Sequence, residues 1–505
     1  METLQTYDEL PYDSLPLPET QPDFLAAVAA LHGYPAPPPR SARVLELGCA
    51  AGGNLIPLAF HHAESDYVGI ELSRLQAEAG ASFIAALGLT NARILHADLA
   101  ALPGDLGTFD YIIAHGVFSW VPPAVQQALL RVCRKHLSPN GLAYVSFNVA
   151  AGWQELLPLR EALVAGTEAH LPAPQRVAQA RALLAELETQ WDDPLLLQEI
   201  AHLQAAAPSY LFHEFLAEYN APMRFADFAH QLQDAGLRYV AEAGPRRAVV
   251  AFATDAATSA TLATRWMDAE AALDEAMQTR FRRGLISRDD APPAHPPQST
   301  QLQGLAFYCD LTSDAEIDLD TASEHDFVNP AGGRFRIANP LLKAGVMALS
   351  TIYPAAMHYT EWVRVANELM THFEASGRRD EAEFRDALFQ MVSVQGVQMC
   401  VESTHRATPL DAMPQAHALA RLQAGTPGWV VSGVRHVALG LDDWGRALLV
   451  LLDGTQSVEM LGHAMQAMLQ RAGAELAEEQ IEALVQQKLD FFARQGLLQT
   501  TLPSA

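Results

Sequence analysis

The sequence predicts an α/β protein with a doubly wound, parallel sheet in its first half and smaller α+β domains in its second half. Three observations predict this fold class. Short apolar segments that suit buried strands alternate with helical patterns over residues 41–150. A strongly helical stretch over residues 151–222 interrupts the alternation. The Pro-rich segment "DDAPPAHPPQST" at residues 289–300 then marks a domain boundary.

The composition indicates a globular chain of several domains. Its 505 residues are 50% hydrophobic, yet no run of about 18 apolar residues occurs, so no membrane span is expected. The N-terminus "METLQTYDELPYD" lacks the basic and apolar segments of a secretory signal. The net charge of -26 disfavours nucleic acid or an anionic membrane as partner. It suits a basic or lysine-bearing partner, although an acidic surface also simply keeps a protein soluble.

Cysteine usage favours a reducing compartment. The chain has four cysteines, which are far apart in sequence and form neither a CxxC pair nor a Cys/His pair: Cys49, Cys133, Cys309 and Cys400. Neither a disulfide framework nor a zinc site is therefore expected. We predict a cytoplasmic protein without a bound metal.

The first 40 residues predict an irregular N-terminal lid. A helix is expected from about Gln21 to Gly33. The proline cluster at residues 35–39 cannot continue a helix and predicts a linker into the sheet.

Residues 41–150 supply the core of the sheet. The predicted strands are "ARVLELG", "YVGIELS", "ARILHADL", "FDYIIAHGV" and "GLAYVSFNV". The predicted helices between them are roughly Asn54–His62, Arg74–Leu87 and Pro123–Leu137. This regular alternation is typical of parallel strands with crossover helices on both faces.

Two segments follow the core. Residues 151–222 form a helical insertion, whose apolar faces suit simple core packing, a homodimer interface or a cover over the substrate. Residues 223–295 return to α/β, with the helix "RFADFAHQLQDAGL" closed by Gly236 and the strand "RYVAEA". The segment "TRFRRGLISR" predicts a last, antiparallel strand.

The second half divides again. Residues 301–405 mix strand and helix patterns and predict a middle α+β domain. Residues 406–428 form a loop or linker. Residues 429–505 predict a small α+β domain that is a candidate winged helix.

The first motif with chemical content is "VLELGCAAGGNL" at residues 44–55, a strand that ends in a glycine-rich turn. Its candidate cofactor-binding residues are Glu46, Gly48, Cys49, Ala50, Gly52, Gly53 and Asn54. A dinucleotide loop reads GxGxxG because its backbone amides must contact two phosphates. Here Ala50 takes the place of the middle glycine. S-adenosylmethionine has no phosphate, so Glu46 with a looser glycine turn suits that ligand better than NAD.

Two further acids end the next two predicted strands. Glu71, beside Leu72, can accept hydrogen bonds from both hydroxyls of a ribose. Asp98 can accept from an adenine amino group, while the amide of Leu99 can donate to the ring. A single acid at a strand end is more often a helix cap than a ligand. Three acids at the carboxyl ends of three successive strands indicate a ligand, because doubly wound sheets bind ligands at that edge.

These motifs together resemble class I S-adenosylmethionine-dependent methyltransferases. The resemblance rests on "VLELGCAAGG", "VGIELS", "HADL" and "FDYIIAHGVFSWVP", in that order over residues 41–150. The wider layout is similar to the subgroup with a methyltransferase regulatory domain, because "PYDS" precedes the sheet and "YLFHEFLAEYNAPMRF" follows the insertion. The subgroup includes bacterial protein-lysine methyltransferases. The resemblance implies a Rossmann-like sheet and S-adenosyl-L-methionine as cofactor.

The resemblance also implies a lid. Tyr12, Ser14 and Thr20 would close over the methionine end of the cofactor. From the residues alone, "YDSLP" is only a turn.

One turn departs from the subgroup. After the fifth strand its members often read "YNTYPGW", whereas this chain reads "FNVAAGW". Asn148, Gly152 and Trp153 are present but the aromatic residue is lost. The contact with the substrate at this turn is therefore left open.

The segment "AHGVFSWVP" follows the fourth strand, where methyltransferases place substrate-side groups. His115, Phe118, Ser119 and Trp120 are candidates to flank the methyl group, and His115 is also a candidate cofactor contact and base. Core packing is the alternative for Phe118 and Trp120, and a buried structural histidine is the alternative for His115. The (D/N)PP(Y/F) signature of enzymes that methylate nucleic-acid amino groups is absent.

Three functions remain compatible with these patterns. The first is methyl transfer to lysine side chains of a protein, for which aromatic rings such as Tyr12, Phe118 and Trp120 could hold the cation. The second is methyl transfer to a small molecule or a lipid-derived metabolite. The third is a non-catalytic protein that binds the cofactor and uses residues 301–505 for interaction.

Overall fold

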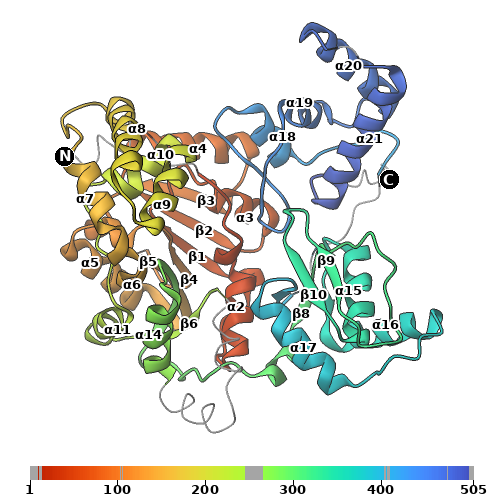
Figure 1. Cartoon of the computed structure of the whole chain (residues 1–505), viewed down its shortest axis with the longest axis horizontal. Helices are drawn as coiled ribbons and strands as arrows, with labels where there is room; N and C mark the ends of the chain where they lie inside the picture. Colours follow the sequence, from red (N-terminus) through yellow and green to blue (C-terminus); the bar gives the residue numbers. More distant parts are fainter. Residues whose placement is uncertain are drawn as a thin grey trace. The chain divides into compact units, whose positions relative to one another are not determined.

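The structure is a computed structural model that describes residues 10, 14–102, 104, 106–244, 266–402, 405, 410–474 and 476–499. Its described residues form two compact units (Figure 1). Unit 1 holds Leu10, Ser14, the segment Pro35–Gly244 and residues 266–296. Unit 2 holds Leu15–Tyr34 and the described part of residues 297–499.

Unit 1 is built on a seven-stranded sheet with the order β3-β2-β1-β4-β5-β7-β6. The strands are β1 Arg43–Leu47, β2 Asp66–Glu71, β3 Ala92–His96, β4 Phe109–Ala114, β5 Leu137–Asn148, β6 Leu237–Glu242 and β7 Phe281–Arg288. The first five strands are parallel, and β7 runs antiparallel to both of its neighbours. The predicted Rossmann-like sheet and the predicted antiparallel last strand are confirmed.

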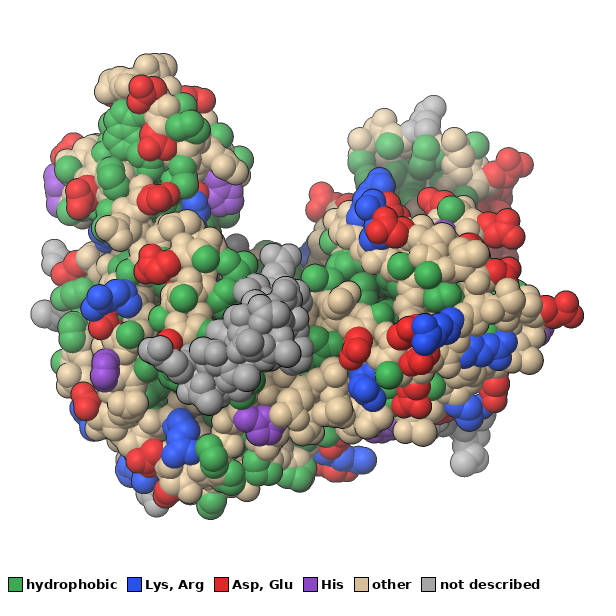
Figure 2. Space-filling model, turned by 60° about the horizontal axis from the view of Figure 1, so that its bottom comes forward, with side chains coloured by type: hydrophobic (Ala, Val, Ile, Leu, Met, Phe, Trp, Pro, Cys, Tyr) green, Lys and Arg blue, Asp and Glu red, His purple; other side chains and the backbone are tan. Residues whose placement is uncertain are grey.

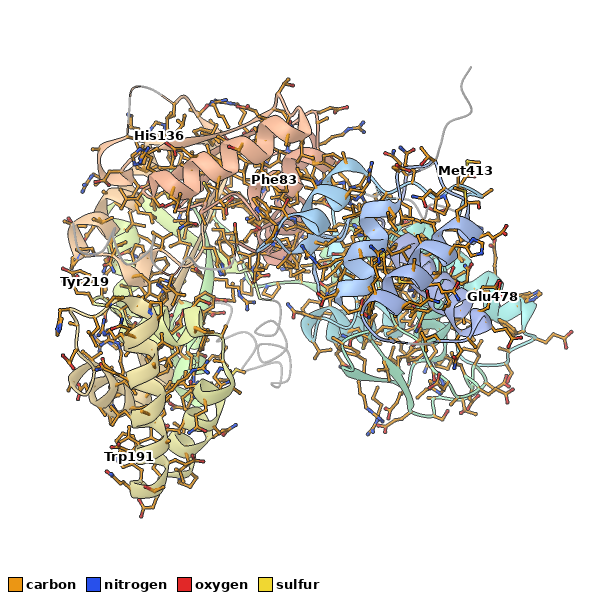
Figure 3. The ribbon with its side chains drawn as sticks, turned by 90° about the horizontal axis from the view of Figure 1, so that it is seen from above. Phe83, His136, Trp191, Tyr219, Met413 and Glu478 are labelled. Carbon is orange, nitrogen blue, oxygen red and sulfur yellow. The ribbon has the colours of Figure 1, made fainter. Side chains whose placement is uncertain are left out.

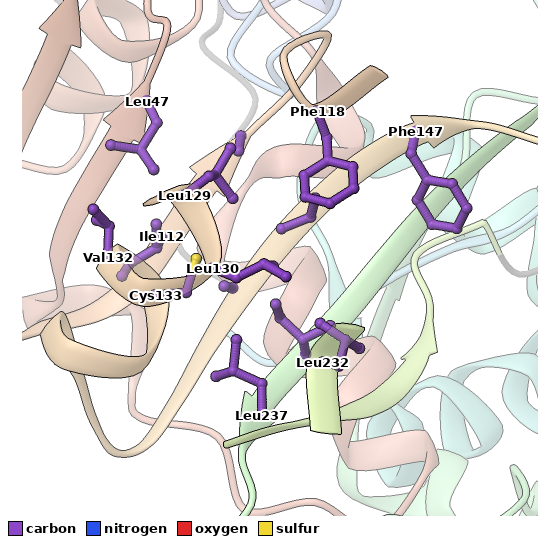
Figure 4. Close-up of a cluster of buried hydrophobic side chains, with 14 of the residues drawn as sticks. Leu47, Ile112, Phe118, Leu129, Leu130, Val132, Cys133, Phe147, Leu232 and Leu237 are labelled. Atoms are coloured by element: carbon purple, nitrogen blue, oxygen red, sulfur yellow. The ribbon is translucent and has the colours of Figure 1, made fainter. Parts of the chain in front are cut away.

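Helices cover both faces of the sheet. They are α3 Leu55–His61, α4 Arg74–Leu87, α5 Pro123–His136, α11 Phe225–Asp234 and α14 Trp266–Met277. Helices α5 and α11 bury apolar side chains such as Leu129 and Leu232 against one face (Figure 4). Helix α4 lies on the opposite face, where its Gly80 leaves room for Ile94 of β3. The helical positions expected for residues 74–87 match α4.

The insertion has a hydrophobic core of its own. Its helices are α6 Ala150–Trp153, α7 Leu157–Ala165, α8 Ala173–Gln190, α9 Pro194–Ala205, α10 Pro208–Leu211 and the π-helix Phe212–Leu216. Trp153, Leu184 and Ile200 belong to this core, and the Trp153 ring lies 5.5 Å from that of Phe215. Figure 3 shows Trp191 at the far tip of the insertion and Tyr219 near its base. Most of the apolar helix faces predicted for the insertion are therefore buried in the insertion's own core.

Unit 2 begins with a helix that the sequence places in the N-terminal lid. Helix α2 Pro22–Leu31 packs with a three-stranded sheet of the second half, whose strands in order are β11 Met357–His358, β8 Ala306–Tyr308 and β12 Gln398–Cys400. Asp23 Oδ1 accepts hydrogen bonds from the amides of Val401 and Glu402 at 2.8 and 3.0 Å. The expected segment 1–40 is thus divided, because α2 belongs to unit 2 whereas Ser14 and the residues from Pro35 onward belong to unit 1.

The middle part of unit 2 combines small sheets with three helices. Its elements are β8 Ala306–Tyr308, β9 His325–Val328, β10 Arg334–Ile337, α15 Pro340–Ile352, β11 Met357–His358, α16 Tyr359–His372, α17 Glu381–Ser393 and β12 Gln398–Cys400. Trp362 is fully buried, and its indole donates a hydrogen bond to the carbonyl of Gly345 at 2.8 Å.

The C-terminal part of unit 2 is a small helical module with a short β-pair. Its elements are α18 Ala418–Gly425, β13 Val431–Ser432, β14 Ala438–Leu439, α19 Asp443–Leu451, α20 Val458–Arg471 and α21 Glu478–Arg494. Leu448, Met465 and Leu489 meet in its core. Among the described helices of the chain, none has the length and apolar run needed to cross a bilayer.

Candidate active site

The loop after β1 adopts a conformation that usually requires glycine. Gly48 and Gly52 have φ values of 73° and 83°, and Ala50 between them has a φ of 49°. Left-handed backbone costs a residue with a Cβ roughly 1–2 kcal/mol, so other contacts must hold Ala50 in place. The amide of Ala50 donates to Glu71 Oε2 at 2.8 Å, which supplies such a contact.

The amides of this loop are largely engaged within the protein. Gly48 and Cys49 both donate to the carbonyl of Ile70, and Gly52 donates to that of Cys49. A pyrophosphate cradle instead points its amides at the ligand. The loop is therefore not arranged to hold phosphates. The thiol of Cys49 is buried beside Gly69, and this burial raises the pKa of the thiol.

Glu46 is a buried acid that faces the start of α3. Its side chain is 5% exposed, and its Oε1 accepts a hydrogen bond from Asn54 Nδ2 at 3.0 Å. No described residue donates to its Oε2. Burial raises the pKa of Glu46 to about 8, against the lowering effect of Asn54, and the charge of Glu71 raises it further. A cationic or hydrogen-bond-donating ligand group would satisfy this oxygen.

Glu71 ends β2 with both oxygens turned to backbone amides. Oε2 accepts from Ala50 and Oε1 accepts from Ser73 at 2.7 Å. Each carboxylate oxygen can accept a second hydrogen bond, so the group can still receive ribose hydroxyls. Leu72 follows it with 41% of its surface exposed, as a side chain that contacts a ligand could be.

Asp98 caps a short helix at the end of β3. Its Oδ1 accepts from the amide of Ala100 at 2.8 Å, at the start of the 3-10 helix Leu99–Ala101. The cap leaves Oδ2 for other donors, and both Asp98 and Leu99 remain accessible. The helix-cap interpretation is therefore correct for Asp98, and it is compatible with ligand binding.

The three expected lid residues fall in different places. Ser14 Oγ accepts from the amide of Gly53 at 2.6 Å, and a Cβ on Gly53 would lie 2.1 Å from the Ser14 carbonyl oxygen. Ser14 thus lies directly against the glycine-rich loop. Tyr12 lies outside the described residues. Thr20 belongs to unit 2, where its hydroxyl donates to the carbonyl of Leu17 at 2.8 Å.

His115 follows β4 and is ordered by two aromatic rings. Its Nδ1 lies 2.9 Å from the hydroxyl of Tyr144 and shares a hydrogen bond with it. The His115 ring lies 5.9 Å from the Tyr144 ring and 5.7 Å from that of Phe281 on β7. His115 as a whole is half-buried.

Phe118 does not flank a ligand, contrary to the expectation from the sequence. Its side chain is 0% exposed and packs edge-on against Phe228 of α11, within the main core of unit 1 (Figure 4). Core packing is therefore the correct interpretation for Phe118. Trp120, two residues later, is half-buried and stays a candidate for contact with the methyl acceptor.

Ser119 joins the end of β4 to the end of β5. Its Oγ accepts from the amide of Asn148 at 2.7 Å, and its carbonyl accepts from Ala221 at 2.9 Å. Asn148 Nδ2 in turn donates to Asn220 Oδ1 at 3.0 Å. Gly152 serves packing, because a Cβ there would lie 2.4 Å from the carbonyl oxygen of Gln278.

The sequence did not point to Tyr144, Ser146, Asn220 or Phe281. The first two share one face of β5 with Asn148, and Ser146 Oγ accepts from the amide after His115 at 2.8 Å. The alternation of "YVSFN" could have placed these three polar residues together. Asn220 and Phe281 come from segments distant in sequence, and only the register of β5 with β7 and the bridge beside Met223 bring them here.

Three family models match parts of this chain. A methyltransferase domain matches residues 45–143, a predicted methyltransferase regulatory domain matches residues 207–288, and the PKMT C-terminal winged helix domain matches residues 412–497. The last match confirms the expected winged helix. The regulatory match spans the end of the insertion, α11, β6 and β7.

Two curated proteins of Rickettsia prowazekii (strain Madrid E), both described as uncharacterized, are similar to this chain. One is 27% identical over 487 residues, which are 94% of this chain and 88% of the relative. The other is 32% identical over 234 residues, which are 45% of this chain and 94% of the relative.

The fold also matches solved structures. PKMT2 from Rickettsia typhi, in complex with AdoHcy, has a TM-score of 0.83 with 21% identity, over 97% of this chain and 100% of that one. A second structure of the same protein has a TM-score of 0.83 with 22% identity over the same shares. At this identity the likeness establishes that the two chains share a fold along their length.

Proposed function

This chain belongs to the class I S-adenosylmethionine-dependent methyltransferases that carry a methyltransferase regulatory domain, and on that premise we propose that it methylates lysine side chains of a protein. The observation that carries the proposal is the match of residues 412–497 to the C-terminal winged helix of PKMT proteins. The chain also shares the fold of PKMT2 from Rickettsia typhi, a protein solved with AdoHcy, over nearly its full length.

The cofactor site fits S-adenosylmethionine by the chemistry of its groups. We assign the ribose hydroxyls to Glu71 and the adenine edge to Asp98 and Leu99. The amino group of the methionine end goes to Glu46, whose Oε2 is buried without a donor among the described residues. Asn54 holds Glu46 in place through Oε1. When bound, the cofactor supplies a methyl group already activated on a sulfonium.

The chain's own residues would align the acceptor and exclude water. Alignment of reacting groups can contribute several kcal/mol or more to a methyl transfer. Trp120 offers a half-buried ring against which an alkylammonium can rest before it loses its proton. The His115–Tyr144 pair offers a route for that proton, because an imidazole and a phenol can each donate and accept.

We propose that the winged helix binds protein rather than nucleic acid. The sequence of α20 contains one cationic residue, Arg471 in its last turn, and α21 begins with Glu478 and Glu479. Phosphate binding needs clustered Lys and Arg, which these helices lack. On the face in Figure 2, acidic and basic side chains of the described residues are interspersed, without a broad basic area.

We further propose a homodimer through the helical insertion and a cytoplasmic location. Leu157 and Val164 of α7 are each 37% exposed and lie seven positions apart, on one side of the helix. Light scattering should give twice the chain mass, and Val164→Asp should shift it toward one chain mass. All four cysteines are free and buried, as suits a reducing compartment.

Labelled S-adenosylmethionine and a lysate of the source cells test the main proposal. We expect label in protein bands and methyl-lysine after acid hydrolysis of those bands. Glu71→Ala should weaken cofactor binding about 100-fold or more in calorimetry, because hydrogen bonds to a charged group contribute roughly 1.5–3 kcal/mol each. Glu78→Ala, an exposed acid on α4 that pairs with Arg74, is the matched control. Label confined to the small-molecule fraction would contradict the proposal.

A further inference from the structure

Arg160 of α7 and Arg176 of α8 are two arginines of the helical insertion that lack an acidic partner. Arg160 Nη2 donates to the carbonyl of Ala217 at 2.5 Å, and Arg176 Nε donates to Thr167 Oγ1 at 3.3 Å. Both acceptors are uncharged, and neither arginine forms an ion pair within the described part of the chain. Acids are not scarce nearby, because residues 151–222 contain ten acidic residues and only three arginines.

Burial makes these two unpaired charges unfavourable. Arg176 is 9% exposed, so water can hydrate little of its guanidinium, and Arg160 is half-buried. Burial lowers the pKa of both arginines, and the charge of Arg176 lowers the pKa of Arg160 further, while the exposed Glu161 partly offsets this. A charged side chain is rarely this buried without a counter-ion, because an isolated charge loses its hydration. The two arginines therefore lack an anion.

Both arginines border the π-helix Phe212–Leu216. The Arg176 guanidinium lies 5.9 Å from the centre of the Phe212 ring at its start, and Arg160 bonds to the carbonyl of Ala217 directly after its end. Helices α7 and α8 both contact this π-helix. The two guanidinium groups are thus placed by one short element, of a kind that occurs often at functional sites.

We propose that Arg160 and Arg176 form a site for a small oxyanion with two negative charges, which is either free phosphate or the phosphoryl group of a small metabolite. Two fixed cations match two negative charges, whereas a carboxylate would leave one cation unbalanced. The terminal nitrogens of Arg176 bond to no described residue, and guanidinium donors suit the oxygens of a phosphate. The site goes beyond the lysine methylation proposed above and does not rest on it.

Thermal unfolding of the full chain tests the site with inorganic phosphate as the probe, and titration calorimetry gives its Kd. Sodium chloride at the same ionic strength measures the general effect of salt, and sodium sulfate supplies a second tetrahedral dianion. Phosphate and sulfate also strengthen apolar burial in any protein, so each shift is compared between the wild type and variants. Glycerol 2-phosphate distinguishes a site that takes only the free ion from one that takes a phosphoryl group.

We expect phosphate at about ten times its Kd to raise the unfolding temperature of the wild type by about 3 °C more than chloride does. Arg160→Gln and Arg176→Gln should each reduce this excess to below about 1 °C. Arg181→Gln is the matched control and should keep it, because Arg181 is an exposed arginine of α8 that donates to the carbonyl of Ala206. The phosphate excess should be larger at about pH 8 than at about pH 5.5, where phosphate is mostly a monoanion, whereas the sulfate excess should not change.

Two results would overturn the site: a phosphate effect no larger than that of chloride in the wild type, or an equal excess in the wild type and both arginine variants. Circular dichroism and binding of S-adenosylhomocysteine confirm that each variant is folded, and either arginine variant alone suffices for the test. If phosphate has no effect while Arg160→Gln shifts the mass from light scattering toward one chain, the arginines pair with carboxylates of a second copy, and the small-anion site is wrong.

Discussion

Two buried ionisable side chains of unit 1, Arg282 and Glu46, differ in how many hydrogen-bond and ion-pair partners the protein supplies to them. Arg282 of β7 is 0% exposed and is surrounded by Glu242, Glu270 and Asp274, with guanidinium–carboxylate distances of 3.4, 2.8 and 2.9 Å. Its guanidinium also lies 4.0 Å from the centre of the Phe225 ring. Burial alone would lower its pKa, but the surrounding acidic groups outweigh that effect and raise it.

Glu46 of β1 is buried to nearly the same degree as Arg282, but the protein supplies it with far fewer hydrogen-bond partners. Asn54 donates to one oxygen, and the other oxygen has no donor among the described residues. Its pKa of about 8 means that the carboxyl is mostly protonated at neutral pH in the absence of ligand. Arg282 is thus a charge whose protein partners stabilise the fold, whereas Glu46 is an acid with one oxygen left for a ligand. A buried ionisable group with an unused oxygen, at the ligand edge of a doubly wound sheet, is the better functional indicator.

Removing the cation from the cluster of Arg282 and its three acidic partners should have the largest effect on the free energy of unfolding. Arg282→Met leaves three buried acids without their cation, and loss of one partner of a buried ion cluster costs about 3–5 kcal/mol. We expect a fall of about 10 °C in the unfolding temperature of unit 1, measured by calorimetry. The control is Arg224→Ala, an exposed pair with Asp227 that should cost under about 1 kcal/mol. Similar losses in both variants would contradict the comparison.

Removing the charge of Glu46 should instead stabilise the ligand-free chain, in a pH-dependent way. Its folded-state pKa of about 8 lies above the ordinary value of 4.5, so the folded chain keeps a proton that the unfolded chain has lost. The resulting stability is complete below about pH 4.5 and is lost as the pH rises through 8. Glu46→Gln should therefore match the wild type near pH 4.5 and exceed it by a few kcal/mol at pH 9. Urea unfolding across this range measures the difference, and a constant difference would refute the assignment.

Replacing Asn54, the hydrogen-bond partner of Glu46, tests the same pH-dependent cost of burying the Glu46 carboxyl. Asn54 stands at the start of α3 but makes no side-chain cap bond there, and its Nδ2 serves Glu46. Asn54→Ala should cost about 1–3 kcal/mol, the usual penalty for a buried polar group that loses its partner. Since Asn54 lowers the pKa of Glu46, the cost should be larger at pH 9 than at pH 6. The same urea series measures it, with Asn91→Ala, whose amide serves backbone carbonyls, as a pH-independent control.

The smallest effect is expected at Ala50. Ala50→Gly removes the strain of a left-handed alanine but adds backbone entropy to the unfolded chain, and these terms are each about 1 kcal/mol. We expect a net change within about 1 kcal/mol and cofactor affinity within about 3-fold, by thermal unfolding and calorimetry. Ala50→Val should destabilise by more, since a branched side chain is worse at positive φ. Equal stability of the wild type and both variants would contradict the strain assigned to Ala50.

Local patterns predicted much of unit 1. Helix α4 and the parallel strands follow from apolar periodicity, and the caps that the structure shows at Ser73 and Gly88 each act on backbone groups only a few residues away. Glu71 and Asp98 were found because the carboxyl ends of parallel strands share one edge. The order in which these motifs occur along the chain, rather than any single residue, indicated the cofactor.

Other features depend on contacts that no local pattern records. Phe118 and Trp120 are two aromatics in one short motif, yet α11 covers the first and leaves the second accessible. Helix α2 has an apolar surface that could pack on either unit, and the amides of Val401 and Glu402 fix it in unit 2 through Asp23.

The sequence by itself determined the fold class of unit 1, the cofactor and the acids that end three successive strands, because strand alternation and short-range capping are properties of neighbouring residues. Tertiary structure alone decided that one oxygen of Glu46 has no donor within the described part of the chain, and that Asn220 reaches Asn148 across a long insertion. Whether a side chain is buried, and which partner it bonds to, depends on which distant segments of the chain come together. The cofactor could therefore be inferred from the sequence, whereas the unpartnered oxygen of Glu46 could be found only in the fold.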